Sequence, residues 1–143
     1  MEKEGEKEAI QMRYLFRKQI GRIGLIPLVS ILGLIFIISE AVQAGIRIIG
    51  ENYVKEAKEA YELVGKRSRW HFIGTLRKHD IRQTMLGIFD MIESVDSLET
   101  ARLIDKKCAQ IGKIMPILIE VNSGREPQKS GVLPEDAERL VRE

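Results

Sequence analysis

The chain has 143 residues, of which 44% are hydrophobic and 31% are charged, and this is the composition of a soluble globular domain that can bury a core without disulfides. Its net charge of +2 does not by itself predict a nucleic-acid partner. Cys108 is the only cysteine and there are only 2 histidines, so an intrachain disulfide is excluded and a metal site is not expected.

The amino-terminal region contains a charged segment followed by an uncharged one. Residues 1–22 carry apolar side chains at helical spacing among many charges, which predicts an N-terminal helix ahead of a domain spanning 23–143. Residues 23–39 contain no charged side chain and follow several arginines and lysines, a pattern that a short membrane span would also give. Because Pro27 and Gly33 interrupt this stretch, we keep a membrane anchor only as the alternative to a buried strand.

Short apolar runs alternate with helical patterns along the rest of the chain. The runs have the length of buried strands, and Gly45, Gly65 and Gly112 stand where the intervening helices would end. This rhythm predicts an α/β fold with a parallel sheet, either doubly wound or part of a (β/α)8 barrel. The predicted strands are residues 25–30, 46–49, 70–73, 91–95 and 115–121, and the predicted helices are residues 39–44, 52–64, 76–86 and 97–111, with a last helix that begins at Pro134.

Four sequence blocks resemble one family. Residues 45–56 read GIRIIGENYVKE, which is similar to the Phe-Gly-Glu-Asn-Tyr-Val-Gln-Glu signature of the pyridoxal phosphate (PLP) homeostasis proteins. Residues 70–76 read WHFIGTL, residues 93–97 read ESVDS and residues 120–131 read EVNSGREPQKSG. These are similar to the family's Trp-His-Phe-Ile-Gly-x-Leu, His-Ser-Val-Asp-Ser and Val-Asn...Glu-x-x-Lys-x-Gly. Four blocks in the same order make a specific signal, whereas any one of them alone would be weak.

The resemblance implies both a fold and a cofactor. It implies a partial (β/α)8 barrel of the alanine racemase N-terminal domain type, with about five of the eight β/α units present and PLP at the carboxyl ends of the strands. It also implies a cytoplasmic, non-catalytic protein that carries or regulates PLP or another B6 vitamer, without nucleic-acid or membrane partners. The domain spanning 23–143 would then be an incomplete PLP-binding barrel, and its open sheet edges would favour self-association.

The position of the cofactor lysine is the main departure from the family. Counting back without a gap from Glu40 places Val29 and Ser30 on the family's Val-Ser, and Ile31 on the lysine that forms the Schiff base. An isoleucine has no amine and cannot form an imine, so covalent attachment of PLP is not expected. One hypothesis for residues 31–38 is a local shift of the reading frame, because matching residues resume abruptly after them.

Three residues are candidates for contact with PLP. The resemblance places Asn52 near the cofactor ring, although an asparagine that precedes a helix also serves as an N-cap. His71 alternates with Trp70 and Phe72 on a strand and so points to the opposite face, where it either lines the barrel or is a satisfied core histidine. Lys129, in a polar loop after the last strand, is either a surface lysine or a cation that attracts phosphate or a second B6 vitamer.

A catalytic alternative stays open at this point. An amino-acid racemase of the same superfamily would need the missing lysine and also acid–base groups on both faces of the substrate imine. On pattern, none of the 3 tyrosines stands at such a position. Cys108 lies within a predicted helix without a paired histidine, which indicates a structural thiol.

Overall fold

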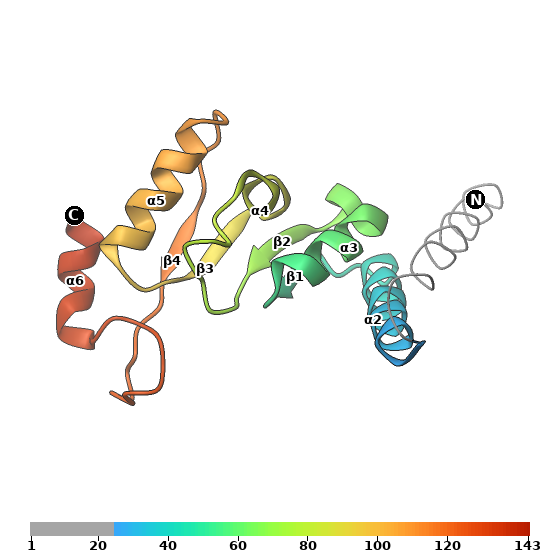
Figure 1. The fold of residues 1–143 in the computed structure, drawn as a ribbon, viewed down its shortest axis with the longest axis horizontal. Coiled ribbons are helices and arrows are strands. Elements are labelled where there is room, and N and C mark those ends of the chain that lie inside the picture. The colour runs from blue at the N-terminus through green and yellow to red at the C-terminus, as the bar shows by residue number, and fades with distance from the viewer. Residues whose placement is uncertain (1–24) are drawn as a thin grey trace.

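The computed structural model describes residues 25–143 (Figure 1), and the helix predicted for residues 1–22 lies outside the described residues. Helices and strands alternate along this part of the chain. In order they are α2 (Leu25–Gln43), β1 (Ile48–Glu51), α3 (Val54–Val64), the 3-10 turn η1 (Gly65–Arg67), β2 (Arg69–Phe72), α4 (Gln83–Ile88), β3 (Met91–Val95), α5 (Leu98–Ala109), β4 (Ile117–Ile119) and α6 (Pro134–Arg142).

The four described strands form one parallel sheet in the order β1-β2-β3-β4. The register joins Ile49 to Trp70 and Phe72 to Ile92. A helix connects each strand to the next (Figure 1), as parallel pairing requires. The predicted α/β fold with a parallel sheet is therefore confirmed, and β1 and β4 are the two edges of the described sheet.

One face of the sheet carries the hydrophobic core. Trp70, Phe72 and Ile92 are at most 1% exposed. The ring of Trp70 meets Tyr61 of α3 edge-on at 5.6 Å, and the ring of Phe72 meets Phe89 at 5.3 Å, in the geometry that aromatic pairs prefer. The indole N–H of Trp70 also donates to the carbonyl of Gly65, which is 2.8 Å away. This face is therefore the side that the helices cover.

The opposite face, which we call the inner face, has no such cover among the described residues. Side chains alternate along a strand, so His71 lies on the inner face, and it contacts Glu93 there. Ile48 of β1 and Leu118 of β4 alternate with Ile49 and Ile117 and also project to this side, and they are 51% and 49% exposed. The inner face thus carries the polar pair His71 and Glu93 on the central strands and exposed apolar side chains on the outer strands β1 and β4.

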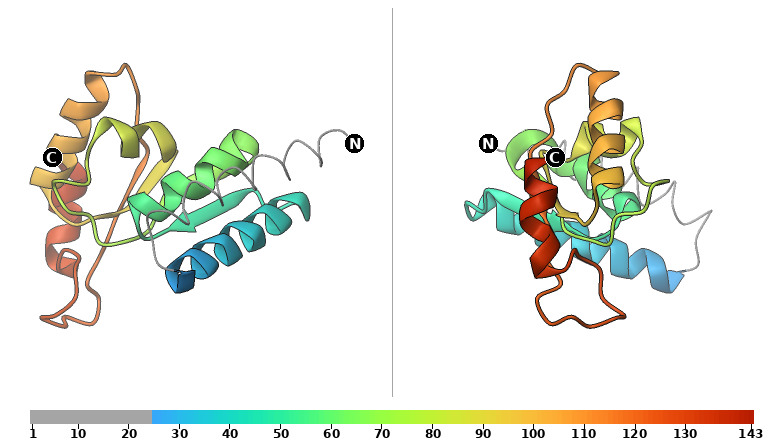
Figure 2. Two further views of the ribbon diagram at one scale, coloured as in Figure 1. Left: turned by 45° about the vertical axis from the view of Figure 1, so that its right-hand side comes forward. Right: turned by 90° about the vertical axis from the view of Figure 1, so that its left-hand side faces the viewer.

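The predicted strand at residues 25–30 is wrong, because these residues belong to helix α2. Ile35, Ile38 and Val42 recur at helical spacing and are buried, and α2 packs against α3 (Figure 2). Pro27 is tolerated because it stands in the first turn, where a helix has no use for the missing N–H. The described chain therefore has four strands where five were predicted.

The other predicted elements occur at nearly the predicted places. β3 has the predicted bounds, and Ser97 caps α5 as expected, since its Oγ accepts from the N–H of Thr100 at 3.3 Å. The helix predicted for residues 76–86 begins only at Gln83. The residues before it form a turn, in which the Asp80 carboxylate accepts from the Arg77 N–H and competes with helix formation.

Within residues 25–143, none of the helices combines the length and the apolar character that a membrane crossing requires. This finding does not favour the membrane-anchor alternative.

Candidate functional site

The carboxyl ends of the parallel strands bring together the loops that carry most of the family-like blocks. Asn52 follows β1, Gly74 and Thr75 follow β2, and Asn122 comes after β4. Proteins with parallel sheets and helical crossovers bind ligands at the carboxyl ends of the strands. The sequence blocks that lie far apart along the chain therefore converge at one end of the sheet.

A cleft of about 260 Å³ lies at the ends of β1 and β2. Gly74 makes this arrangement possible, because a Cβ at that position would stand only 2.1 Å from the carbonyl oxygen of Asn52. The lining offers an amide, a hydroxyl, a guanidinium and a carboxylate, which are groups that orient a polar ligand. The residues that line the cleft are Asn52, Tyr53, Val54, Phe72, Gly74, Thr75, Arg77 and Asp80.

Asn52 is exposed and lines this cleft. The N-cap of α3 is Tyr53, and no side-chain hydrogen bond caps the helix. The capping role that sequence alone offered for Asn52 is therefore not what the structure shows. Its amide has no hydrogen-bond partner among the described residues and is available to a ligand.

His71 lies deeper, and it is not among the residues that line the cleft. Its side chain is 11% exposed, and its Nδ1 stands 2.6 Å from Oε1 of Glu93, whose side chain is 34% exposed. This contact joins β2 to β3 on the inner face and satisfies one ring nitrogen. The contact with Glu93 accounts for one ring nitrogen of His71, and a role of this side chain in a ligand site stays a prediction.

Glu51 is a buried carboxylate beside the cleft. It is 7% exposed, and its pKa is raised above the ordinary value of 4.5, chiefly by burial and then by the nearby charge of Glu56. Both causes disfavour the ionised form. The ionised carboxylate of Glu51 at the end of β1 is therefore less favourable in the folded protein than a neutral side chain would be.

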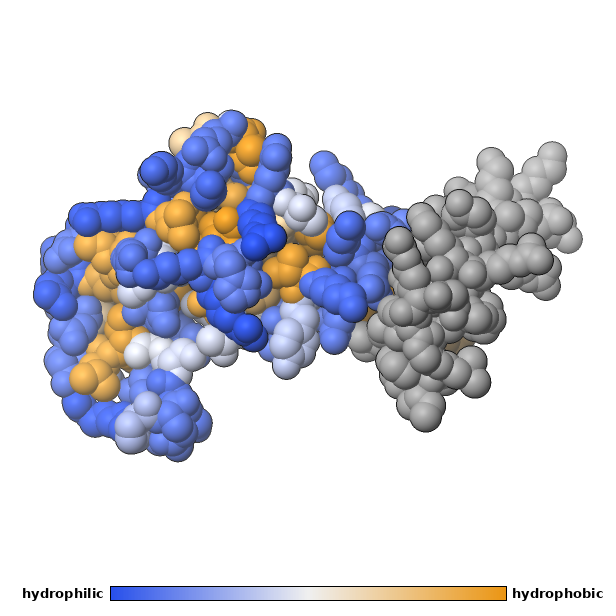
Figure 3. All heavy atoms as spheres, viewed as in Figure 1, coloured by the Kyte–Doolittle hydropathy of each residue, from blue (hydrophilic) through white to orange (hydrophobic). Residues whose placement is uncertain are grey.

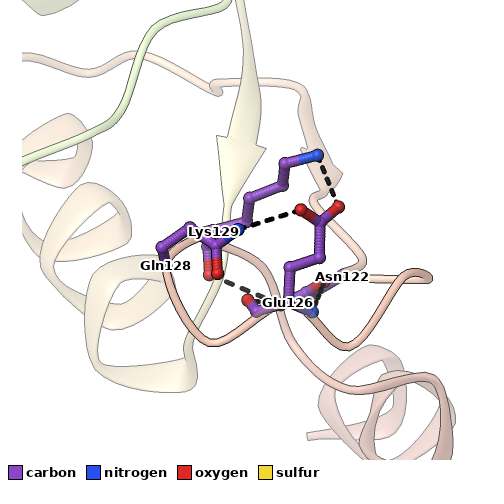
Figure 4. Close-up of polar contacts among 4 residues, drawn as sticks. All are labelled: Asn122, Glu126, Gln128 and Lys129. Carbon is purple, nitrogen blue, oxygen red and sulfur yellow. Dashed lines mark hydrogen bonds and ion pairs between the residues drawn. The ribbon is translucent and has the colours of Figure 1, made fainter.

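The loop after β4 forms a second cavity, of about 460 Å³. Figure 4 shows the Lys129 ammonium pointing at the Glu126 carboxylate, and Nζ and Oε1 are 2.6 Å apart. Asn122 holds the same loop, since its amide accepts from the N–H of Glu126 at 3.1 Å and donates to the carbonyl of Glu126 at 2.9 Å. The structure therefore pairs Lys129 with an acidic neighbour, at the wall of a cavity that Thr75 also lines.

Arg125 fixes the far side of this loop. It is a non-glycine residue with a φ of 54°, and its guanidinium donates two hydrogen bonds of 2.9 Å to Glu135 of α6. This bidentate pair lowers the pKa of Glu135 and raises that of Arg125. Arg125 is thus committed to holding the loop against α6 rather than to a ligand.

Among the described residues, no lysine lines the cleft at Asn52, and Ile31 belongs to α2 rather than to a strand end. A Schiff base needs a primary amine next to the aldehyde. The described residues therefore do not fit covalent PLP, although the amide, hydroxyl and guanidinium of the cleft could bind a polar ring and phosphate without a covalent bond. No cluster of potential metal ligands occurs in residues 25–143 either.

Of the residues that line the cleft, only Asn52 is a candidate from the sequence. Three of the others carry side-chain hydrogen-bond donors, namely Tyr53, Thr75 and Arg77. The first two stand inside the family-like blocks, directly after Asn52 and Gly74, so adjacency to those blocks was the available signal. The sequence did not indicate that Arg77 would line the cleft, because Arg77 lies in a turn where a helix was predicted.

Comparisons with known proteins agree with this architecture. The family model described as "Alanine racemase, N-terminal domain" matches residues 30–143. A pyridoxal phosphate homeostasis protein of Helicobacter pylori is 37% identical over 92 residues, which are 64% of this chain and 41% of the relative. One from Schizosaccharomyces pombe is 31% identical over 136 residues, which are 90% of this chain and 57% of the relative.

A solved structure gives the same answer for the fold. PipY of Synechococcus elongatus with PLP bound matches with a TM-score of 0.65 and 30% identity, over 76% of this chain and 50% of that one. The chain thus spans about half the length of the proteins it matches. Because the family model covers most of the chain and the described strands form one parallel sheet, the chain belongs to the alanine racemase N-terminal domain family, as a partial barrel.

Proposed function

We propose that this chain is a PLP homeostasis protein with a degenerate or incomplete site, which binds PLP or another B6 vitamer without a Schiff base and without catalytic turnover. Its similarity to proteins named for PLP homeostasis supports the proposal. The observation that carries it is the polar cleft at the strand ends, which has Asn52 in its wall and no lysine among the described residues that line it. The proposal places residues 23–143 in one incomplete PLP-binding domain, behind an N-terminal helix at residues 1–22.

The proposed contacts have different geometric support. Asn52 has a free amide in the cleft and is proposed as the ring contact. Lys129 is proposed to attract the phosphate of a vitamer into the cavity of the loop after β4, in competition with Glu126. We propose that His71 stabilises the site without contacting the ligand, because its Nδ1 is held by Glu93.

Two further parts of the proposal concern the surroundings of the molecule. A protein that buffers a reactive vitamin aldehyde is expected in the cytoplasm, where PLP-dependent enzymes take up their cofactor, and without a nucleic-acid partner. We also propose self-association, because unpaired strand edges readily pair with another chain.

The test compares reversible with covalent binding of PLP. The full chain is titrated with PLP by equilibrium dialysis, and a parallel sample is reduced with borohydride and analysed by intact mass and peptide mapping. We expect weak, saturable binding that pyridoxine 5'-phosphate, which lacks the aldehyde, displaces equally well. Loss of affinity by about 1–2 kcal/mol in Asn52→Ala, typical of one removed hydrogen bond, would locate the ligand in the cleft.

The variant Ile31→Lys, with the unmodified chain as its control, tests the absence of the amine. Ile31→Lys introduces the amine, yet we expect no covalent adduct at position 31 because the residue lies in α2, away from a strand end. A stoichiometric reduced adduct at position 31 in that variant would refute this placement. A reduced adduct in the unmodified chain at any single lysine, formed at the PLP concentration that saturates the cleft, would refute the non-covalent mode.

A further inference from the structure

The cleft at the ends of β1 and β2 is rich in hydrogen-bond donors that have no partner among the described residues. Thr75 and Arg77 are exposed and line the cleft. Neither the hydroxyl of Thr75 nor the guanidinium of Arg77 makes a hydrogen bond or an ion pair within the described part of the chain. The same holds there for the amide of Asn52 and the hydroxyl of Tyr53. Unpaired donors therefore surround one small cavity.

The guanidinium of Arg77 differs from two neighbouring cations, which already have carboxylate partners. Lys78 pairs with Glu99 at 2.6 Å, and Lys129 pairs with Glu126 at 2.6 Å. An anion that binds to either ammonium has to displace the carboxylate that is already there, whereas an anion at Arg77 displaces only water. The geometry therefore favours Arg77 as the cation that an anionic ligand of the cleft contacts.

The turn between β2 and α4 fixes the backbone of Arg77 and leaves its side chain unpaired. The carbonyl of Arg77 accepts from the N–H of Asp80 at 2.8 Å, and the N–H of Arg77 donates to the Asp80 carboxylate at 3.3 Å. The other carboxylate oxygen of Asp80 lies 3.5 Å from Nε2 of His79. Hydrophilic side chains cover this turn, near the middle of the view in Figure 3. Asp80, the one acidic residue among the described residues that line the cleft, is thus engaged with the turn and not with the guanidinium.

The start of helix α3 adds backbone donors to the same cavity. Tyr53 is the N-cap of the helix and Val54 is its first residue, and both line the cleft. No side chain caps this helix, and the N–H groups of a first turn have no partner within the helix. Such groups favour a negative charge, and here they add to the effect of the guanidinium.

We propose that the cleft binds the phosphate group of a phosphate monoester and that Arg77 is the residue that selects it. A guanidinium donates a pair of parallel hydrogen bonds to a phosphate, and the hydroxyl of Thr75 is a further donor. The inference rests on the proposed function for the identity of the ligand. A vitamer whose ring lies at Asn52 presents its phosphate to Arg77, so the chain discriminates phosphorylated from unphosphorylated B6 vitamers.

The experiment compares pyridoxine 5'-phosphate, pyridoxine and inorganic phosphate by isothermal titration of the full 143-residue chain. We expect pyridoxine 5'-phosphate to bind about tenfold more tightly than pyridoxine, which is the factor that one charge-assisted hydrogen bond contributes. Arg77→Gln should remove this preference and leave the affinity for pyridoxine unchanged. The control Lys55→Gln removes an exposed cation of α3 that does not line the cleft, and it should keep the preference. Circular dichroism checks that both variants are folded.

The three ligands separate a failure of this inference from a failure of the proposed function. Equal affinities for pyridoxine 5'-phosphate and pyridoxine, or a preference that survives Arg77→Gln, would overturn the role of Arg77 and leave the B6 site intact. Binding of inorganic phosphate but of neither vitamer, abolished by Arg77→Gln, would support the phosphate site and refute the proposed function. Absence of binding for all three ligands would overturn both.

The cavity of the loop after β4 shares Thr75 with the cleft, so Lys129→Gln is measured with the same three ligands. Since Lys129 lines only the cavity of that loop, we expect this variant to keep the preference for pyridoxine 5'-phosphate over pyridoxine. A preference that is lost in Lys129→Gln and kept in Arg77→Gln would place the phosphate in the loop cavity and overturn the inference.

Discussion

Single residues of the site could be chosen from the sequence, but their contacts could not. Asn52 was found because it stands in a family-like block, and the structure places it in the cleft. The alternation of His71 with Trp70 and Phe72 correctly gave its face of the sheet, yet nothing in the sequence indicated that Glu93, two residues beyond its register partner Met91, would reach its ring. Long-range pairs of this kind depend on strand register, which local sequence does not encode.

Glu51 leads to a prediction about the pH dependence of stability. A carboxyl group whose pKa is raised in the folded state stabilises the fold fully below its unfolded pKa, and that contribution is lost as the pH rises through the folded pKa. Burial raises the pKa of Glu51 above 4.5, so at neutral pH its charge destabilises the fold. We therefore expect Glu51→Gln to raise the midpoint of thermal unfolding at pH 7 and to leave it unchanged near pH 4.

The control for this prediction is Glu40→Gln on the exposed surface of α2, which should have little effect at either pH. Thermal unfolding followed by circular dichroism at both pH values measures the difference. An equal gain for Glu51→Gln at pH 4 and pH 7 would mean that packing rather than charge is responsible.

Helix α4 shows how one element depends on a distant one. Its last turn ends beside Lys113, whose ammonium donates to the carbonyls of Leu86 and Phe89, both 2.6 Å away. The carbonyls at a helix end have no partner within the helix, and a cation is favourable there. The sequence could not predict this cap, because Lys113 lies in the loop after α5.

Removal of that ammonium should destabilise the fold measurably. Hydrogen bonds that involve a charged group contribute about 1.5–3 kcal/mol, so we expect Lys113→Met to lower the free energy of unfolding by about 2 kcal/mol. Denaturant unfolding measures this change. Lys106→Met, which removes an exposed lysine from the last turn of α5, should cost less than about 0.5 kcal/mol. Equal losses in the two variants would contradict the capping role.

Helix α2 includes the one predicted element whose type, strand rather than helix, was wrong. Residues 25–30 have the composition of a buried strand, and a short apolar run cannot be assigned to strand or helix by composition alone. The helical assignment follows from what comes after, since Ile35, Ile38 and Val42 extend the same periodic face onto α3. The family resemblance reinforced the wrong choice, because it supplied a strand at the position where this chain departs most from the family.

At the scale of the whole molecule, the alternation of strands and helices predicted the connectivity, and the family resemblance predicted a partial barrel. Alternating strands and helices gave the parallel order correctly, because right-handed crossovers leave few other topologies. The alternation of strands and helices does not indicate which strands have a neighbour on both sides. On its own it could not show that β1 and β4 are both edges of the described sheet. The consequence is a sheet in which β2 and β3 are paired on both sides while the outer strands are paired on one.

This difference in pairing between the inner and the outer strands should be visible in amide hydrogen exchange. Local opening free energies range from near zero at exposed elements to the global value, about 5–15 kcal/mol, in the core. Because Trp70 and Ile92 are fully buried and α6 has no buried residue, we expect β2 and β3 to exchange slowest and α6 fastest. If the open edges are the site of the proposed self-association, dilution should speed exchange in β1 and β4 before it affects β2 and β3. Uniform protection across the four strands, independent of concentration, would show that the two edges are not sites of association.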